Sequence, residues 1–147
     1  MEKYPTPTTR KGPADTFTGD VFVDGIADGG DPSRLVAAHV RFTPGARTHW
    51  HSHALGQTLH CTDGVGFVGT RDGRVLVLHP GETIWTPPGD EHWHGGTTDH
   101  LMCHLALLVA PEEGDATTWL EAVTEDQYHA AHSLLGADRA AAGIDQP

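Results

Sequence analysis

Closely spaced turn signals constrain the fold of this 147-residue chain more than any other feature of its sequence. Asp72-Gly73, between Val68 and Val75, predicts a β-hairpin, because Gly adopts the positive φ angles that tight hairpin turns require. Further turn signals lie at Pro44-Gly45, Asp63-Gly64, Pro80-Gly81 and Pro87-Pro88-Gly89-Asp90. They separate short β-like segments at 16–23, 35–43, 56–62, 64–70, 74–78, 82–86 and 101–109. This pattern predicts an all-β, antiparallel sandwich or small barrel.

The two ends of the chain have a different character. The first 12 residues are rich in Thr and Pro and predict a flexible arm, and residues 13–136 are expected to form a single domain. Between 117 and 135 a near-helical spacing relates Trp119, Leu120, Val123 and Tyr128. A capping box from Thr124 to Gln127 supports one or two short helices in this region. Residues 137–147, rich in Ala, Gly and Asp, predict a disordered tail.

Composition narrows the partners and the compartment. A formal net charge of -11 argues against nucleic acid or an anionic membrane, because the long-range field repels both. The chain has no apolar run near the roughly 18 residues of a spanning helix and no apolar signal region, which predicts a cytoplasmic location. Cys61 and Cys103 are too few for a disulfide framework and are expected to be reduced and buried. The expected partner is a small-molecule substrate.

Histidine is concentrated in two short stretches, His-Trp-His-Ser-His from residue 49 and His-Trp-His from residue 92. Side chains alternate along a strand, so His49, His51 and His53 share one face, and His92 and His94 share another. Several histidines inside an apolar barrel are costly unless they are hydrogen-bonded or bound to a metal. The alternation alone leaves both explanations open.

The spacing around these histidines carries a family resemblance. The first stretch runs Gly45, five residues, His51-x-His53, three residues, Gln57, six residues, Gly64. The second runs Gly81, five residues, Pro87-x-Gly89, two residues, His92. Together they resemble the two motifs of the cupin superfamily, which are antiparallel β-barrels of jelly-roll type with a metal in the lumen. Gln57 stands where most cupins have Glu, and Gly96 replaces the usual Asn.

Longer strings are similar to the small bacterial cupins that include the manganese-dependent hydroxynitrile lyases. The matching strings include Lys-Gly-Pro-Ala-Asp-x-Phe-Thr-Gly (11–19), Trp-His-x-His-x-Leu-Gly-Gln-Thr-Leu (50–59), His-Trp-His-Gly (92–95) and Val-Thr-Glu-Asp-Gln-Tyr (123–128). The chain departs from that group at Ala54, where Pro is usual, and at Glu91, where Lys is usual. The resemblance implies a homodimer or homotetramer that cleaves or forms cyanohydrins with one divalent metal, Mn(II).

The resemblance also implies roles for individual residues. His51, His53, Gln57 and His92 are the implied metal ligands, and His104 is the implied acid/base residue. Imidazole and amide ligands alone also admit Fe, Ni, Zn or Cu. Four neutral ligands leave the metal its full dipositive charge, which favours Lewis-acid chemistry with small anions such as cyanide.

The alternation of side chains along strands adds residues to the candidate site. Along 101–109, His104 and Leu108 lie on one face and Cys103 lies on the other. Cys61 shares the face of Gln57, so the two cysteines are poorly placed to pair. We expect Ala38, Val40 and Leu108 to line the substrate pocket. His49 and His94 are expected either to orient the ligands or to line the pocket. For His104 the alternative is a buried histidine bonded to a backbone carbonyl.

Some alternatives remain open at this level. The four tryptophans, Trp50, Trp85, Trp93 and Trp119, form either an aromatic substrate pocket or barrel packing. The same ligand set also suits a cupin dioxygenase with Fe or Mn, a metal-dependent isomerase or cyclase, or a sensor that only binds a ligand, because fold and ligands do not determine the reaction.

Overall fold

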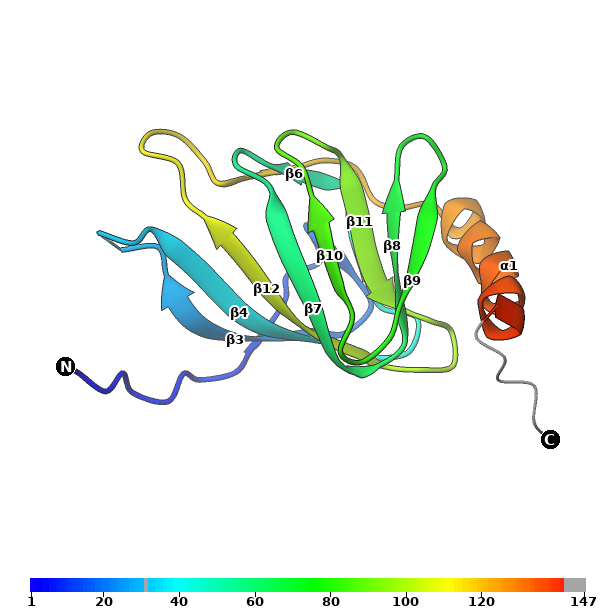
Figure 1. Ribbon diagram of the computed structural model, residues 1–147, viewed down its shortest axis with the longest axis horizontal. Coiled ribbons are helices and arrows are strands. Elements are labelled where there is room, and N and C mark those ends of the chain that lie inside the picture. The colour runs from blue at the N-terminus through cyan, green and yellow to red at the C-terminus, as the bar shows by residue number, and fades with distance from the viewer. Residues whose placement is uncertain (31, 142–147) are drawn as a thin grey trace.

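Two antiparallel β-sheets curl toward each other and enclose the core in the computed structural model, which describes residues 1–30 and 32–141 (Figure 1). The first sheet has the order β1 (Arg10–Lys11), β3 (Val21–Asp28), β4 (Leu35–Phe42), β12 (Met102–Val109), β7 (Gln57–Gly64) and β10 (Thr83–Thr86). The second has the order β13 (Thr117–Trp119), β6 (His51–His53), β11 (His92–Gly96), β5 (Arg47–Thr48) and β2 (Phe17–Thr18), with β8 (Gly66–Thr70) between β11 and β9 (Val75–Leu78). The predicted all-β antiparallel architecture is confirmed.

Side chains that point inward from alternate positions of the strands fill the space between the sheets. The inward side chains of the first sheet form an apolar cluster with residues of the second, including Val40, Phe42, Leu59, Val68 and Met102. The register of β12 puts His104 opposite Val40 on one side and opposite Cys61 on the other. His104 and Cys61 therefore both lie in this core, while Cys103 lies opposite Arg41 on the other face. Both cysteines are free and buried, as expected.

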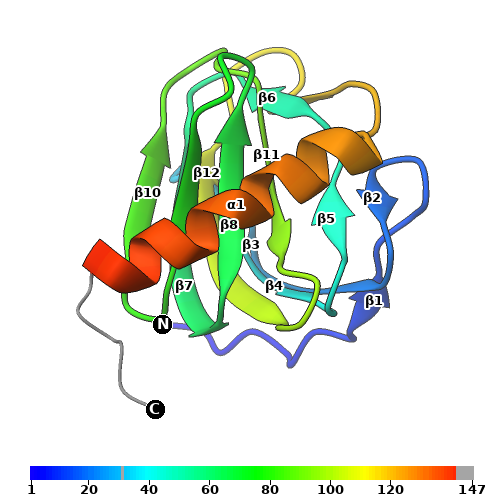
Figure 2. The same cartoon turned by 90° about the vertical axis from the view of Figure 1, so that its right-hand side faces the viewer.

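A single helix, α1 (Glu125–Ala141), covers the outer face of β8 and β9 (Figure 2). The predicted capping box is present, because the Thr124 amide donates to Gln127 Oε1 at 2.9 Å and the Gln127 amide donates to Thr124 Oγ1 at 3.2 Å. Tyr128 and Trp93 pack together in the second apolar cluster under this helix. Trp93 thus points away from the face that carries its neighbours His92 and His94.

Three boundaries differ from the predictions. Residues 117–119 form strand β13 rather than part of a helix, since β-branched and aromatic residues there pair with β6. Arg10 and Lys11, within the predicted flexible arm, pair with β3. The helix continues to Ala141, five residues into the predicted disordered tail, and residues 142–147 lie outside the described residues. Within residues 1–30 and 32–141 one helix forms where one or two were expected.

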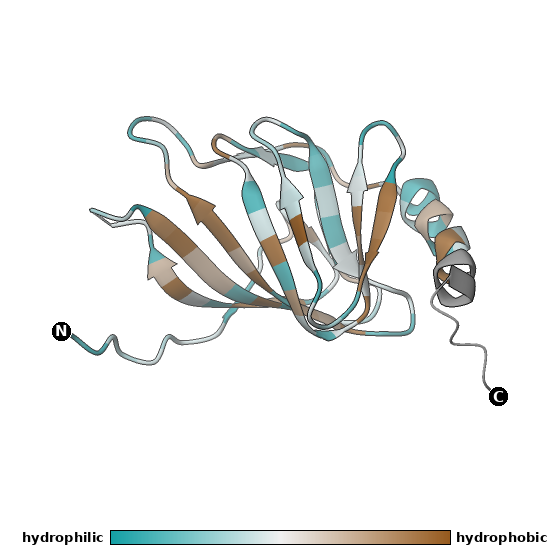
Figure 3. Cartoon of the chain, viewed as in Figure 1, coloured by the Kyte–Doolittle hydropathy of each residue, from teal (hydrophilic) through white to brown (hydrophobic). Residues whose placement is uncertain are grey.

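Strand β11 combines burial with polarity. All five of its residues are buried, yet Figure 3 colours much of the strand as hydrophilic. Burying imidazole rings is unfavourable unless their nitrogens find partners, so this strand marks the candidate site.

Within the described ranges no helix has the length and apolar character needed to cross a membrane.

Candidate metal centre

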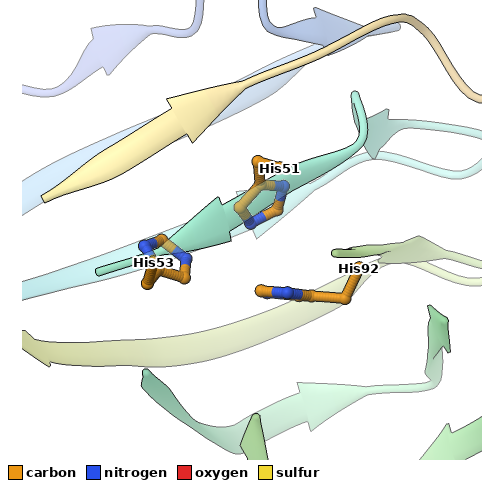
Figure 4. A group of neighbouring side chains, drawn as sticks. All are labelled: His51, His53 and His92. Carbon is orange, nitrogen blue, oxygen red and sulfur yellow. The ribbon is translucent and has the colours of Figure 1, made fainter. Parts of the chain in front are cut away.

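Three histidines from two adjacent strands converge inside the barrel (Figure 4). His51 on β6 lies directly opposite His92 on β11, and His53 follows two residues along the same face of β6. One ring nitrogen from each residue lies within 4.8 Å of the other two. All three side chains are at least 96% buried, with exposed fractions of 1%, 4% and 0% for His51, His53 and His92.

The second nitrogen of each ring has its own hydrogen-bond partner. His51 Nδ1 lies 2.9 Å from the carbonyl oxygen of His49, and His92 Nδ1 lies 3.0 Å from the carbonyl oxygen of Asp90. A carbonyl oxygen only accepts, so Nδ1 carries the proton in both rings and Nε2 keeps its lone pair. His53 Nδ1 lies 3.0 Å from Thr117 Oγ1, which can accept in the same way. These contacts leave Nε2 of all three rings free to bind a metal.

Gln57 completes the set of donors. Its Oε1 atom lies 3.1 Å from His92 Nε2, and both side chains are buried. With the proton of His92 on Nδ1, this short contact brings two lone pairs together, which is repulsive without a cation beside them. His53 Nε2 is also buried, and it has no hydrogen-bond partner. Three imidazole nitrogens and one amide oxygen with these unsatisfied lone pairs fit a divalent transition metal.

Burial keeps the histidines of the site neutral, as metal binding requires. Desolvation, helped by the charge of His92, lowers the pKa of His53 to about 4. Desolvation also lowers the pKa of His92, and it lowers the pKa values of His51 and His94 well below the usual range, where neighbouring histidines add to the effect. The pKa of His104 falls to about 3, again mainly through desolvation. A proton therefore competes weakly with a metal near neutral pH.

His94 and His104 form a buried pair beside the three converging histidines. His104 Nε2 lies 3.0 Å from His94 Nδ1. The His94 ring centroid is 5.1 Å from that of His51 and 5.8 Å from that of His92, so His94 lies between these rings and His104. His94 Nε2 and His104 Nδ1 are buried without a hydrogen-bond partner. His94 therefore bonds His104, and its role, either orienting a ligand or lining the pocket, stays a prediction.

The other predicted site residues occupy different positions. His49 contributes its carbonyl oxygen to His51, and its amide donates to the Thr16 carbonyl. Val40 and Cys61 flank His104 on the neighbouring strands β4 and β7. Ala38 packs against the same apolar core, and Leu108, half-buried, pairs with Val36 near the end of β12.

Two residues at the site, Thr117 and Phe42, were not among the predictions. Thr117 on β13 contacts His53. Trp119, for which a pocket and a packing role were both left open, has its ring 4.6 Å from the His51 ring. Phe42 lies 5.7 Å from His94 and 5.4 Å from His104, measured between ring centroids. The parity of β4, which places Ala38 and Val40 inward, was the signal that could have identified Phe42.

A curled antiparallel barrel with a buried three-histidine centre is the arrangement of a metal-binding cupin. Residues 38–109 match the family model described as a cupin domain. An (R)-mandelonitrile lyase from Granulicella tundricola is 47% identical over 118 residues, which cover 80% of this chain and 89% of that protein. The chain therefore belongs to the cupin family.

Solved structures agree on the fold. A cupin-like protein from Thermotoga maritima matches with a TM-score of 0.79 and 35% identity, over 89% of this chain and 97% of that chain. A polyketide cyclase from Streptomyces resistomycificus matches with a TM-score of 0.65 and 18% identity, over 91% of this chain and 98% of that chain. At 18% identity the second match concerns the fold alone. The expected cupin barrel is thus confirmed.

Proposed function

We propose that this cupin is a manganese-dependent lyase that cleaves and forms cyanohydrins. The observation that carries the proposal is the all-neutral donor set of His51, His53, His92 and Gln57 beside the buried pair His94 and His104. The 47% identity of this chain to a protein named as an (R)-mandelonitrile lyase supports the same reaction. We further propose that the protein works as a cytoplasmic homodimer or homotetramer.

The four donors suit this chemistry because none of them carries a negative charge. A divalent metal held by them supplies an undiminished positive charge, which attracts the cyanide that leaves in the reaction. The hydrogen bonds from Nδ1 of His51 and His92 to backbone carbonyls hold the rings in the orientation and tautomer that this role needs.

The His94–His104 pair provides the site for the proton. If His104 Nε2 donates to His94 Nδ1, then His104 Nδ1 is an unprotonated acceptor; in the reverse tautomer, His94 Nε2 is the free acceptor. The pair therefore presents one unprotonated buried nitrogen in either arrangement. We assign the base to His104, whose pKa of about 3 keeps it neutral.

The proposed step balances without a further reactant. His104 takes the hydroxyl proton of the cyanohydrin while the C–O bond becomes a carbonyl and the C–CN bond breaks. Cyanide leaves with the electron pair of that bond and then receives the proton, so the products are an aldehyde or ketone and hydrogen cyanide. The proton that His104 takes is the one that cyanide receives, so the base returns to its starting state.

Anaerobic turnover of mandelonitrile by protein stripped of metal and reloaded with Mn(II) tests the proposal. We expect benzaldehyde release, little activity in His51→Ala, and a rate about a hundredfold lower in His104→Ala with its metal content unchanged. His60→Ala is the matched control, because His60 is a β7 histidine that bonds Thr83 outside the core. A fully loaded site that releases cyanide from no aromatic or aliphatic cyanohydrin contradicts the proposal, and oxygen uptake with substrate indicates a dioxygenase instead.

A further inference from the structure

The four tryptophans of the chain occupy three different environments. Trp50 and Trp93 are buried in the apolar cluster under α1 and serve packing. Trp85 is 57% exposed on β10, next to Gly56, where an added Cβ would meet the Trp85 ring. Trp119 differs from these three, because it is 40% exposed and also contacts a histidine of the candidate metal centre.

Strand pairing explains how Trp119 reaches the centre. On β13, Trp119 lies opposite His51 and Thr117 lies opposite His53, so both side chains share the face of the histidines they contact. The indole and imidazole centroids are 4.6 Å apart with an interplanar angle of 37°. Part of the indole thus packs on His51 while the rest remains open to solvent at the edge of the site.

A row of aromatic rings connects this exposed edge with the buried histidine pair. The Trp119 ring lies 5.8 Å from Phe17, which lies 6.4 Å from Phe42, and Phe42 lies 5.4 Å from His104. Interplanar angles of 59°, 60° and 46° leave these rings tilted rather than stacked face to face. Tilted rings present edges and faces to which a further aromatic ring can add favourably.

We propose that Trp119, supported by Phe17, binds the aromatic ring of the substrate and makes the enzyme prefer aryl over alkyl cyanohydrins. The inference rests on the proposed lyase function and deepens it by naming the substrate class and a specificity-determining residue. An apolar wall that leads to a few polar groups is the usual construction of a small-molecule site. The packing of Trp50 and Trp93 and the position of Trp85 leave Trp119 as the tryptophan that can act in this way.

Trp119→Leu tests the proposal, because Leu stays apolar but has no ring. We expect kcat/KM for mandelonitrile to fall about tenfold, mainly through a higher KM, and kcat/KM for acetone cyanohydrin to change less than about twofold. Trp119→Phe should retain most of the aryl preference. Trp85→Leu is the matched control and should leave both substrates unaffected. If Trp119→Leu does not fold, Trp119→Met serves in the same comparison.

Binding of benzyl alcohol to the metal-loaded protein, followed by saturation-transfer NMR, separates this inference from the lyase proposal. If no cyanohydrin is cleaved but benzyl alcohol binds and Trp119→Leu abolishes the binding, the lyase proposal fails and the aromatic site stands. An equal fall in kcat/KM for both cyanohydrins in Trp119→Leu overturns the inference. A loss of metal content in that variant also overturns it, because Trp119 then only supports His51.

Discussion

Thr117→Val removes the hydrogen bond of His53, a proposed metal ligand, without changing His53 itself. Thr117 Oγ1 lies 3.0 Å from Nδ1 of His53, a side chain that is almost fully buried. Val has nearly the shape of Thr but lacks the hydroxyl, so the substitution removes the acceptor and preserves the packing. We expect the variant to fold normally and to bind Mn(II) more weakly.

The magnitude follows from the state of the His53 ring. In the metal-bound protein Nε2 must be unprotonated, so Nδ1 keeps its proton and, in the variant, loses the Thr117 hydroxyl as its acceptor. A buried donor without a partner costs about 1–3 kcal/mol. The metal-free ring is not held by a metal, so it can turn or move its proton to Nε2 on the side of Gln57, whereas the metal-bound ring cannot. The difference weakens the affinity for Mn(II) by a factor of about 5 to 150.

Equilibrium dialysis against buffered Mn(II), with metal measured by mass spectrometry, gives the dissociation constants. Thr118→Val is the matched control, because Thr118 is exposed and pairs with Ser52 on the opposite face of the same strand. It should bind Mn(II) as the unmodified protein does. If Thr117→Val and Thr118→Val bind Mn(II) with equal affinity, the hydrogen bond does not select the His53 tautomer and the reasoning is wrong.

Three further predictions concern charge, acidity and the helix. Gln57→Glu adds a negative charge to the donor set, so Mn(II) should bind at least tenfold more tightly in dialysis while mandelonitrile cleavage slows. The folded pKa values of His53 (about 4) and His104 (about 3) lie below the unfolded value of about 6.5, so the unfolded chain binds protons first as the pH falls. Each of the two residues should therefore lower the free energy of unfolding of the metal-free protein by about 2 kcal/mol when the pH falls from 7 to 5. Urea denaturation at both pH values measures this change, and equal stability at pH 7 and pH 5 contradicts the prediction. Thr124→Ala removes the helix cap and should lower thermal stability by about 1 kcal/mol without changing metal content.

The convergence of the proposed ligands was predictable because their geometry is local. Alternation along one strand places His51 and His53 on the same face whatever the rest of the chain does. Gln57 required a turn between it and His53, and Gly56, with φ of +81°, lies in that turn. Parity likewise identified the faces of His104 and Cys61. For these residues the resemblance to cupins and the alternation of strands lead to the same site.

The contribution of β13 was not predictable, because it depends on non-local pairing. Three residues are too few to show a period of two, and the helical spacing that follows them extends back over Trp119. Their strand conformation comes from hydrogen bonding to β6, more than 60 residues earlier in the chain. The alternation of side chains also predicts only part of the position of His94. It predicts the face of the strand on which His94 lies, but not that His94 lies between the three converging histidines and His104.

The three residues of strand β13 serve both the proposed metal centre and the proposed binding of the substrate ring. Thr117 contacts His53 and Trp119 contacts His51, while Thr118 between them faces outward. The two contacts involve different histidines and different physical effects, a hydrogen bond and ring packing. Their consequences should therefore be separable: Thr117→Val alters Mn(II) affinity but not aryl preference, and Trp119→Leu does the reverse. In the double variant the Mn(II) affinity should equal that of Thr117→Val and the aryl preference should equal that of Trp119→Leu, each within about 0.5 kcal/mol, since only coupled sites deviate from additivity.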